Sequence, residues 1–172
     1  MKRATALLVF LLLPAFASAG KVVLVTADTV QSFAVDFDTG GNIYFVEMNG
    51  GERLKRVEAD GKVTVLAGTG KKGFSGDGGD ALKAEFNGMH NLAVAPDGTI
   101  YLADTFNNCI RKYDPATKKI ETFAGTGKKG FSGDDGPAAK AEFNQTICIA
   151  LTPDGSAKPG CPRTANSPRI NR

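Results

Sequence analysis

The sequence AGTGKKGFSGDGGDALKAEFN at residues 67–87 recurs almost unchanged as AGTGKKGFSGDDGPAAKAEFN at residues 124–144. Each stretch opens a block of 32 residues that ends in a Pro-Asp-Gly turn. The two blocks, 67–98 and 124–155, are set 57 positions apart and are identical at 22 positions. At ordinary residue frequencies, about two identities would be expected by chance. The chain is therefore a repeat protein, and the repeat decides its fold.

Four short strands are predicted between the two copied stretches. The segments 91–95, 100–104, 110–113 and 119–124 are mostly apolar or alternate apolar with polar residues. Turn residues such as Pro96-Asp97-Gly98 separate them, as expected for antiparallel strands. Four-stranded units that repeat at a fixed period are typical of propeller blades. We therefore predict an all-β fold, a β-propeller built from four-stranded blades.

A diverged unit precedes the first block. It offers four matching segments, with an insertion of two residues in the first turn: 32–37, 43–47, 54–57 and 62–67. Residues 21–27 resemble the fourth strand of a blade and predict an N-terminal closing strand, which in a ring would pair with the last blade. The second block opens another blade at 147–151. The prediction is a partial ring of about two complete blades plus the closing strand.

The loops between blades carry helix-forming residues. Residues 81–86 contain Ala, Leu, Lys and Glu after Asp80, which can cap a helix, and residues 138–143 repeat the pattern;. Short helical turns are therefore expected in these loops.

The N-terminal 19 residues have the pattern of a signal peptide. Lys2 and Arg3 precede an apolar run, and Ala17-Ser18-Ala19 forms a cleavage site before Gly20;. The run is shorter than the roughly 20 residues of a membrane span. We predict a secreted or periplasmic protein with no membrane span after cleavage. An uncleaved N-terminal anchor is the alternative.

The C-terminal part departs from the repeat. Residues 20–155 form the predicted partial propeller, whereas residues 156–172 contain three prolines and no alternating run where a second strand is due. We predict an irregular tail, disordered or out of frame. Six units of this length would need roughly 340 residues, so we interpret the chain as a fragment of a longer ring. The alternative is self-association of partial rings through exposed blade edges.

Charge and cysteine content exclude some classes of protein. Residues 20–155 carry 15 basic and 18 acidic residues, a net charge of −3, so a basic nucleic-acid-binding face is not predicted. Cys109, Cys148 and Cys161 are too few for a disulfide framework, although one bridge of undecided pairing is allowed;. No spacing typical of a structural zinc site is present;.

One further pattern of residues resembles the repeat of a known protein family. Residues 103–114 read A-D-T-F-N-N-C-I-R-K-Y-D, and the copied stretch A-G-T-G-K-K-G-F-S-G-D follows. The combination resembles the bacterial extracellular form of the NHL repeat over roughly residues 31–155. Departures are Met48 to Arg53, which replace the usual Asn-rich turn, and Cys109, where Arg is common. The resemblance implies a six-bladed propeller related at fold level to gluconolactonase-type lyases and hydrolases, and it fixes fold better than function.

Acidic residues in the copied loops could bind a cation. Asp77, Asp134 and Asp135 lie among glycines, where carboxylates and carbonyls can chelate calcium;. The competing interpretation is that these side chains bond their own backbone to hold the turn, because the spacing is not that of a calcium loop. No cofactor is predicted, with calcium or another divalent metal as the alternative.

Five residues are candidates for ligand binding: His90, Asn91, Asp104, Asn107 and Asn108. His90 is the only histidine, and our alignment sets it against Gln31 and Ile147, so a three-histidine metal site cannot form;. Asp104, Asn107 and Asn108 have a structural interpretation as well, because such side chains often cap and cross-link turns. No catalytic set can be assembled from the sequence.

Two functions follow as hypotheses. The first is an exported, non-enzymatic propeller that binds a protein, peptide or glycan or acts as a scaffold. The second, implied by the resemblance and by His90, is a metal-dependent lyase or lactonase with its site in the central channel. Nucleic acid is not an expected partner, because RNA-binding NHL propellers are intracellular.

Overall fold

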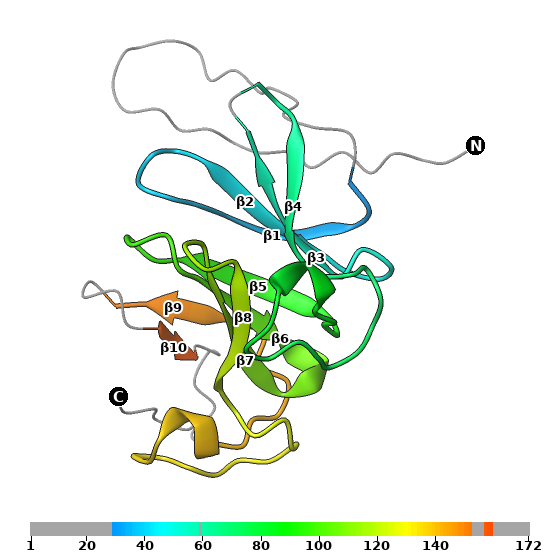
Figure 1. Cartoon of the computed structure of the whole chain (residues 1–172). Helices are drawn as coiled ribbons and strands as arrows, with labels where there is room; N and C mark the ends of the chain where they lie inside the picture. The colour runs from blue at the N-terminus through cyan, green and yellow to red at the C-terminus, as the bar shows by residue number, and fades with distance from the viewer. Residues whose placement is uncertain (1–28, 59, 153–156, 160–172) are drawn as a thin grey trace, which may run out of the picture.

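Two four-stranded antiparallel sheets pack against one another in the computed structural model, which describes residues 29–58, 60–152 and 157–159 (Figure 1). In each sheet the strands lie side by side in chain order. The first sheet, blade 1, contains β1 (Ser32–Phe37), β2 (Ile43–Glu47), β3 (Arg53–Val57) and β4 (Val63–Ala67). The second, blade 2, contains β5 (Met89–Val94), β6 (Ile100–Asp104), β7 (Cys109–Asp114) and β8 (Lys119–Ala124). The predicted fold class is confirmed.

A third sheet begins after blade 2. It pairs β9 (Ile149–Leu151) with β10 (Ala157–Pro159) in antiparallel register. β10 lies where the repeat places a second strand, so for these three residues the expectation of an irregular tail differs from the structure. A strand edge offers backbone hydrogen bonds that do not depend on side-chain alternation, and a proline is tolerated at a strand end. The predicted signal peptide and closing strand lie outside the described residues.

The register between strands corrects one sequence expectation. Phe37 pairs with Ile43 in blade 1, and Val94 pairs with Ile100 in blade 2, so the two first turns have the same length. The predicted two-residue insertion is wrong, because β5 extends back to Met89, which pairs with Asp104. The positions equivalent to His90 are therefore Phe33 and Ile147, and not Gln31.

The loops between blades contain short 3₁₀ helices rather than α-helical turns. Asp80 caps η1 (Ala81–Lys83) by accepting a hydrogen bond from the Leu82 N–H, as predicted. The equivalent η3 (Ala138–Lys140) follows Pro137 and has no side-chain cap. A third, η2 (Thr105–Asn107), forms the turn between β6 and β7 and ends on Asn108 in the left-handed conformation.

The hydrophobic core lies between consecutive sheets. One buried cluster joins Val46 and Leu54 of blade 1 to Leu92 and Leu102 of blade 2. A second joins Ile110 and other residues of blade 2 to the third sheet. Removing the large apolar side chains of these clusters from water contributes about 2 kcal/mol each. Face-to-face packing of successive four-stranded sheets is the arrangement of propeller blades.

Candidate functional site

The copied loop of one blade is held by an arginine of the next. The Arg111 side chain is fully buried, and its guanidinium lies over the rings of Phe74 and Phe86, 5.1 and 5.4 Å from their centroids. Its Nη2 donates hydrogen bonds to the Ser75 carbonyl oxygen at 3.0 Å and to Asp77 Oδ1 at 2.6 Å. The two motifs quoted above, G-F-S-G-D and N-N-x-I-R-K, therefore contact each other. We call Phe74, Asp77, Phe86 and Arg111 the arginine clasp.

Asp104 and Asn107 extend this clasp. Asp104 is fully buried and accepts hydrogen bonds from the Asn87 N–H at 2.7 Å and from Asn107 Nδ2 at 2.8 Å. Asn107 Nδ2 also donates to the Gly73 carbonyl oxygen at 2.7 Å. Arg111 Nη1 lies 3.5 Å from Asp104 Oδ2, close enough for an ion pair but without a hydrogen bond. These contacts join the β6–β7 turn to the loop that enters blade 2.

Burial raises the pKa of Asp104 to about 6. Loss of water disfavours the charged carboxylate. The hydrogen bonds from Asn107 and the Asn87 N–H, together with the nearby Arg111 charge, offset only part of this effect. Because the folded pKa is above its ordinary value, Asp104 stabilises the fold fully below about pH 4, and this contribution is lost as the pH rises through about 6.

The substitution Asp104→Asn tests this pH dependence. Asparagine keeps an acceptor oxygen but cannot ionise. We expect the free energy of unfolding of the variant, relative to the unsubstituted protein, to rise by about 2 to 3 kcal/mol between about pH 4 and pH 7.5. Urea unfolding at several pH values measures the difference. A difference that does not change with pH would contradict the raised pKa.

Asn108 links blade 2 to the third sheet. Its Oδ1 accepts a hydrogen bond from the Gln145 N–H at 3.1 Å. The corresponding residue of blade 1, Glu52, accepts from the Gly88 N–H at 3.1 Å. Both acceptors have positive φ, as do Gly88 and Gln145. The equivalence of the two contacts shows that Asn108 has a structural role in joining consecutive blades.

Asn91 makes a second link, between the first strands of consecutive blades. Its Oδ1 accepts from the Ile149 N–H at 3.0 Å, and Asp36, on the first strand of blade 1, accepts from the Val94 N–H at 2.8 Å. A polar side chain on each of β1 and β5 thus bonds the backbone of the next blade's first strand.

His90 lies apart from these links, in an aromatic cluster with Phe33 and Phe106. The imidazole packs edge-on against Phe33, with ring centroids 4.8 Å apart, and against Phe106 at 5.4 Å. Its Nδ1 lies 2.9 Å from the Gly88 carbonyl oxygen. Phe33 and Phe106 are 55% and 44% exposed. A side chain at Gly88 would collide with the Phe106 ring, so this glycine leaves room for the cluster.

The five predicted ligand-binding residues therefore separate into two groups. Asp104, Asn107 and Asn108 form hydrogen bonds within and between blades, as in their structural interpretation, and Asn91 bonds the next blade as well. His90 instead lies beside partly exposed aromatic rings. Arg111 was not predicted from the sequence as a site residue, although it stands in the N-N-x-I-R-K pattern. The predicted residues also lacked a partner for His90. Phe33 was missed because the first strands were aligned two residues out of register.

Within residues 29–58, 60–152 and 157–159, no group of three or more His, Cys, Asp or Glu side chains is placed to hold a metal ion. Asp77, one of the candidate calcium ligands, is bound to Arg111. Cys109 and Cys148 are free thiols, and burial raises the pKa of Cys109. Cys161 lies outside the described residues. The described part of the chain contains no helix that could cross a membrane.

The fold and its repeated links define the class of protein: consecutive blades of a β-propeller. Residues 17–114, more than half of the chain, match the family model of the Teneurin NHL domain. The chain belongs to this family of NHL-repeat propellers.

The chain is similar to proteins of known sequence and, in fold, to a solved structure. The chain is 44% identical over 78 residues to Protein SUPPRESSOR OF QUENCHING 1, chloroplastic, of Arabidopsis thaliana, a match to 44% of this chain and 7% of that protein. It is 38% identical over 69 residues to mouse Teneurin-1, covering 34% of this chain and 2% of the relative. A protein of unknown function from Bacteroides thetaiotaomicron has a similar structure, with a TM-score of 0.63 and 23% identity over 76% of this chain and 34% of the other. The chain thus spans small parts of much longer relatives.

Proposed function

We propose that this chain is a section of an exported, non-enzymatic propeller that binds a protein, peptide or glycan partner at the aromatic cluster Phe33, His90 and Phe106. The observation that carries the proposal is the partial exposure of two phenylalanine rings that hold a histidine between them. Aromatic rings of this kind supply large contact area at low entropic cost in binding sites.

The surrounding framework supports a binding role. Asn91 and Asn108 anchor the neighbouring strands and turns by hydrogen bonds, so the cluster stands on rigid elements, as effective binding sites do. Ile147, at the position equivalent to Phe33 and His90, is also exposed. NHL domains are generally protein-interaction modules. The proposal places the signal peptide at residues 1–19, the propeller section at 20–155 and a mainly irregular tail at 156–172.

The test is binding by variants of the cluster. The purified protein is applied to oligosaccharide and peptide arrays, and the strongest ligand is then titrated by calorimetry. We expect Phe33→Ala with Phe106→Ala to weaken binding at least about tenfold, because buried aromatic anchors contribute 1 to 2 kcal/mol or more each.

The matched control is Phe131→Ala, which removes another exposed ring, 63% exposed, from a copied loop. It should leave the affinity unchanged. Equal loss in the control, or full binding by the double variant, would contradict the proposed site. Hydrolysis of a lactone that is lost in His90→Gln would instead contradict the non-enzymatic assignment.

A further inference from the structure

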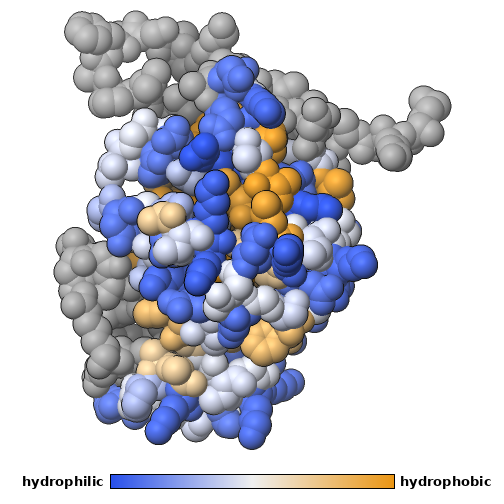
Figure 2. Space-filling model, viewed as in Figure 1, coloured by the Kyte–Doolittle hydropathy of each residue, from blue (hydrophilic) through white to orange (hydrophobic). Residues whose placement is uncertain are grey.

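A groove opens between blade 1 and blade 2, away from the aromatic cluster. Its volume is about 390 Å³, and its wall includes Val65 and Leu66 of β4 and Leu82 of η1. Figure 2 shows hydrophobic residues gathered in this region and bordered by hydrophilic ones. The volume and the apolar wall are typical of sites for small molecules.

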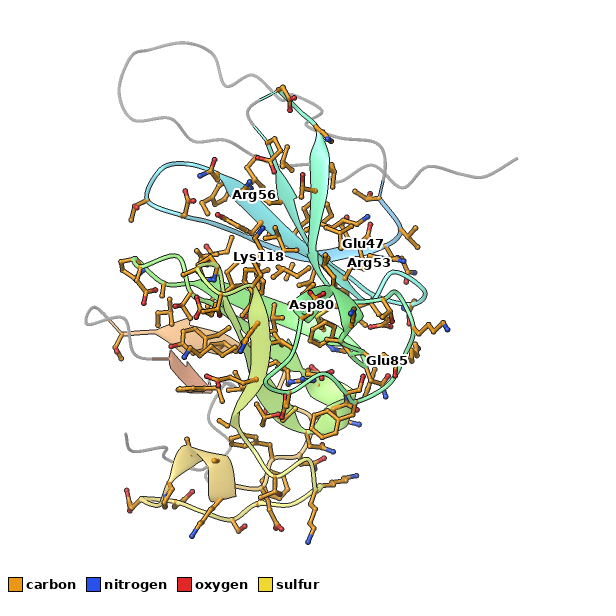
Figure 3. The ribbon with its side chains drawn as sticks, viewed as in Figure 1. Glu47, Arg53, Arg56, Asp80, Glu85 and Lys118 are labelled. Carbon is orange, nitrogen blue, oxygen red and sulfur yellow. The ribbon has the colours of Figure 1, made fainter. Side chains whose placement is uncertain are left out.

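Three polar groups reach the groove from blade 2 and from the loop before it. Tyr113 of β7, Lys118 of the β7–β8 turn and Asp80 before η1 all line it. Figure 3 shows Lys118 and Asp80 along the junction of the sheets, below Arg56 of blade 1. Arg56 is already paired with Glu58, to which it donates three hydrogen bonds of 2.8 to 3.1 Å.

Tyr113 is a buried residue with an unused hydroxyl. The side chain is only 4% exposed, and its hydroxyl has no hydrogen-bond partner among the residues that the structure describes. That oxygen is not among the enclosed polar atoms without a partner, and Tyr113 lines the groove, so we place the hydroxyl within reach of a ligand there. A ligand seated in the groove can exchange a hydrogen bond with this hydroxyl in place of water.

Lys118 and Asp80 carry opposite charges but do not pair with each other. No ion pair of the Lys118 ammonium is found in the described part of the chain. Asp80 uses Oδ1 to accept from the Leu82 N–H at 3.0 Å, which leaves Oδ2 for a ligand. Arg56 and Tyr44 also line the groove, but Arg56 is paired with Glu58 and the Tyr44 hydroxyl donates to Asp38. Beside its apolar wall the groove therefore presents one cation and one anion that are not paired with each other, and the Tyr113 hydroxyl.

We propose that this groove binds a free α-amino acid with an apolar side chain. The carboxylate of the amino acid is bound by Lys118 and by the Tyr113 hydroxyl. Its ammonium group is bound by Asp80, and its side chain packs on Val65, Leu66 and Leu82. A zwitterion matches the opposite charges of the groove, whereas a singly charged ligand leaves one of them uncompensated.

The experiment uses L-phenylalanine as the probe and the intact chain labelled with ¹⁵N. We expect chemical-shift changes at the amides of Val65, Leu66 and Leu82, with a Kd on the order of 1 mM for a ligand of this size. N-acetyl-phenylalanine lacks the ammonium group and phenylalanine amide lacks the carboxylate. Each should bind at least about fivefold more weakly, because each loses one charge-assisted hydrogen bond.

Three variants test the protein side without disturbing the fold. Tyr113→Phe removes a hydroxyl that makes no hydrogen bond within the described residues. Asp80→Asn keeps the helix cap. Lys118 lies in the turn between β7 and β8, so Lys118→Gln leaves both strands intact. Each should weaken L-phenylalanine binding about three- to tenfold, whereas Lys128→Gln in the copied loop should not. Absence of shifts at the groove, equal binding of the N-acetyl or amide derivative, or unchanged affinity in the three variants would overturn the proposal.

Discussion

Phe86→Ala should lower the free energy of unfolding by about 4 kcal/mol, because it removes a large, fully buried side chain from the core;. Phe86 is fully buried in the cluster between blades 1 and 2. Its ring also forms one wall of the arginine clasp. The truncation therefore leaves a cavity and uncovers one face of a buried charge, and both effects act in the same direction. Urea unfolding of the purified chain measures the loss.

The control for this change is Phe131→Ala, which makes the same truncation at an exposed ring. Its effect should stay within about 0.5 kcal/mol. If the two variants lost equal stability, the core between the two blades would not be packed as described.

Much of the fold could be predicted because its signals are local. The alternation Ile-Tyr-Leu-Ala-Asp and the Pro-Asp-Gly turns gave β6 and the turn before it, and β8 has the predicted bounds as well. The bounds of the first strand in each blade were harder to predict. β5 begins on Met89 and His90, which carry no clear alternation with the residues that follow, and only the pairing of Met89 with Asp104 defines the start.

The candidate site was harder to predict because its contacts join distant segments. Arg111 reaches Ser75 and Asp77 across 36 and 34 residues, and no local pattern reports such contacts. The recurrence of the loop motif was evidence for copied structure, but not for the residue that binds it. The aromatic cluster also depends on register, because Phe33 meets His90 only when the first strands are aligned correctly.

The second large effect is expected for Arg111→Met. The substitution keeps an unbranched side chain of similar length but removes the charge beside the buried Asp104. It also removes the hydrogen bonds to Ser75 and Asp77. Breaking a buried ion pair from one side typically costs about 3 to 5 kcal/mol. We expect a loss of about 3 kcal/mol near neutral pH, because Asn107 and the Asn87 N–H still bond the carboxylate.

The copied loop motif is a structural connector that binds the arginine of the next blade. A double-mutant cycle tests this most directly, with Asp77→Asn and Arg111→Met made singly and together and each measured by urea unfolding. Glu58→Gln, whose partner is Arg56, serves as the reference in place of Asp77→Asn. The clasp predicts a coupling free energy of about 1 kcal/mol or more between Asp77 and Arg111, and none between Glu58 and Arg111. Additive effects of Asp77→Asn and Arg111→Met would contradict the claim.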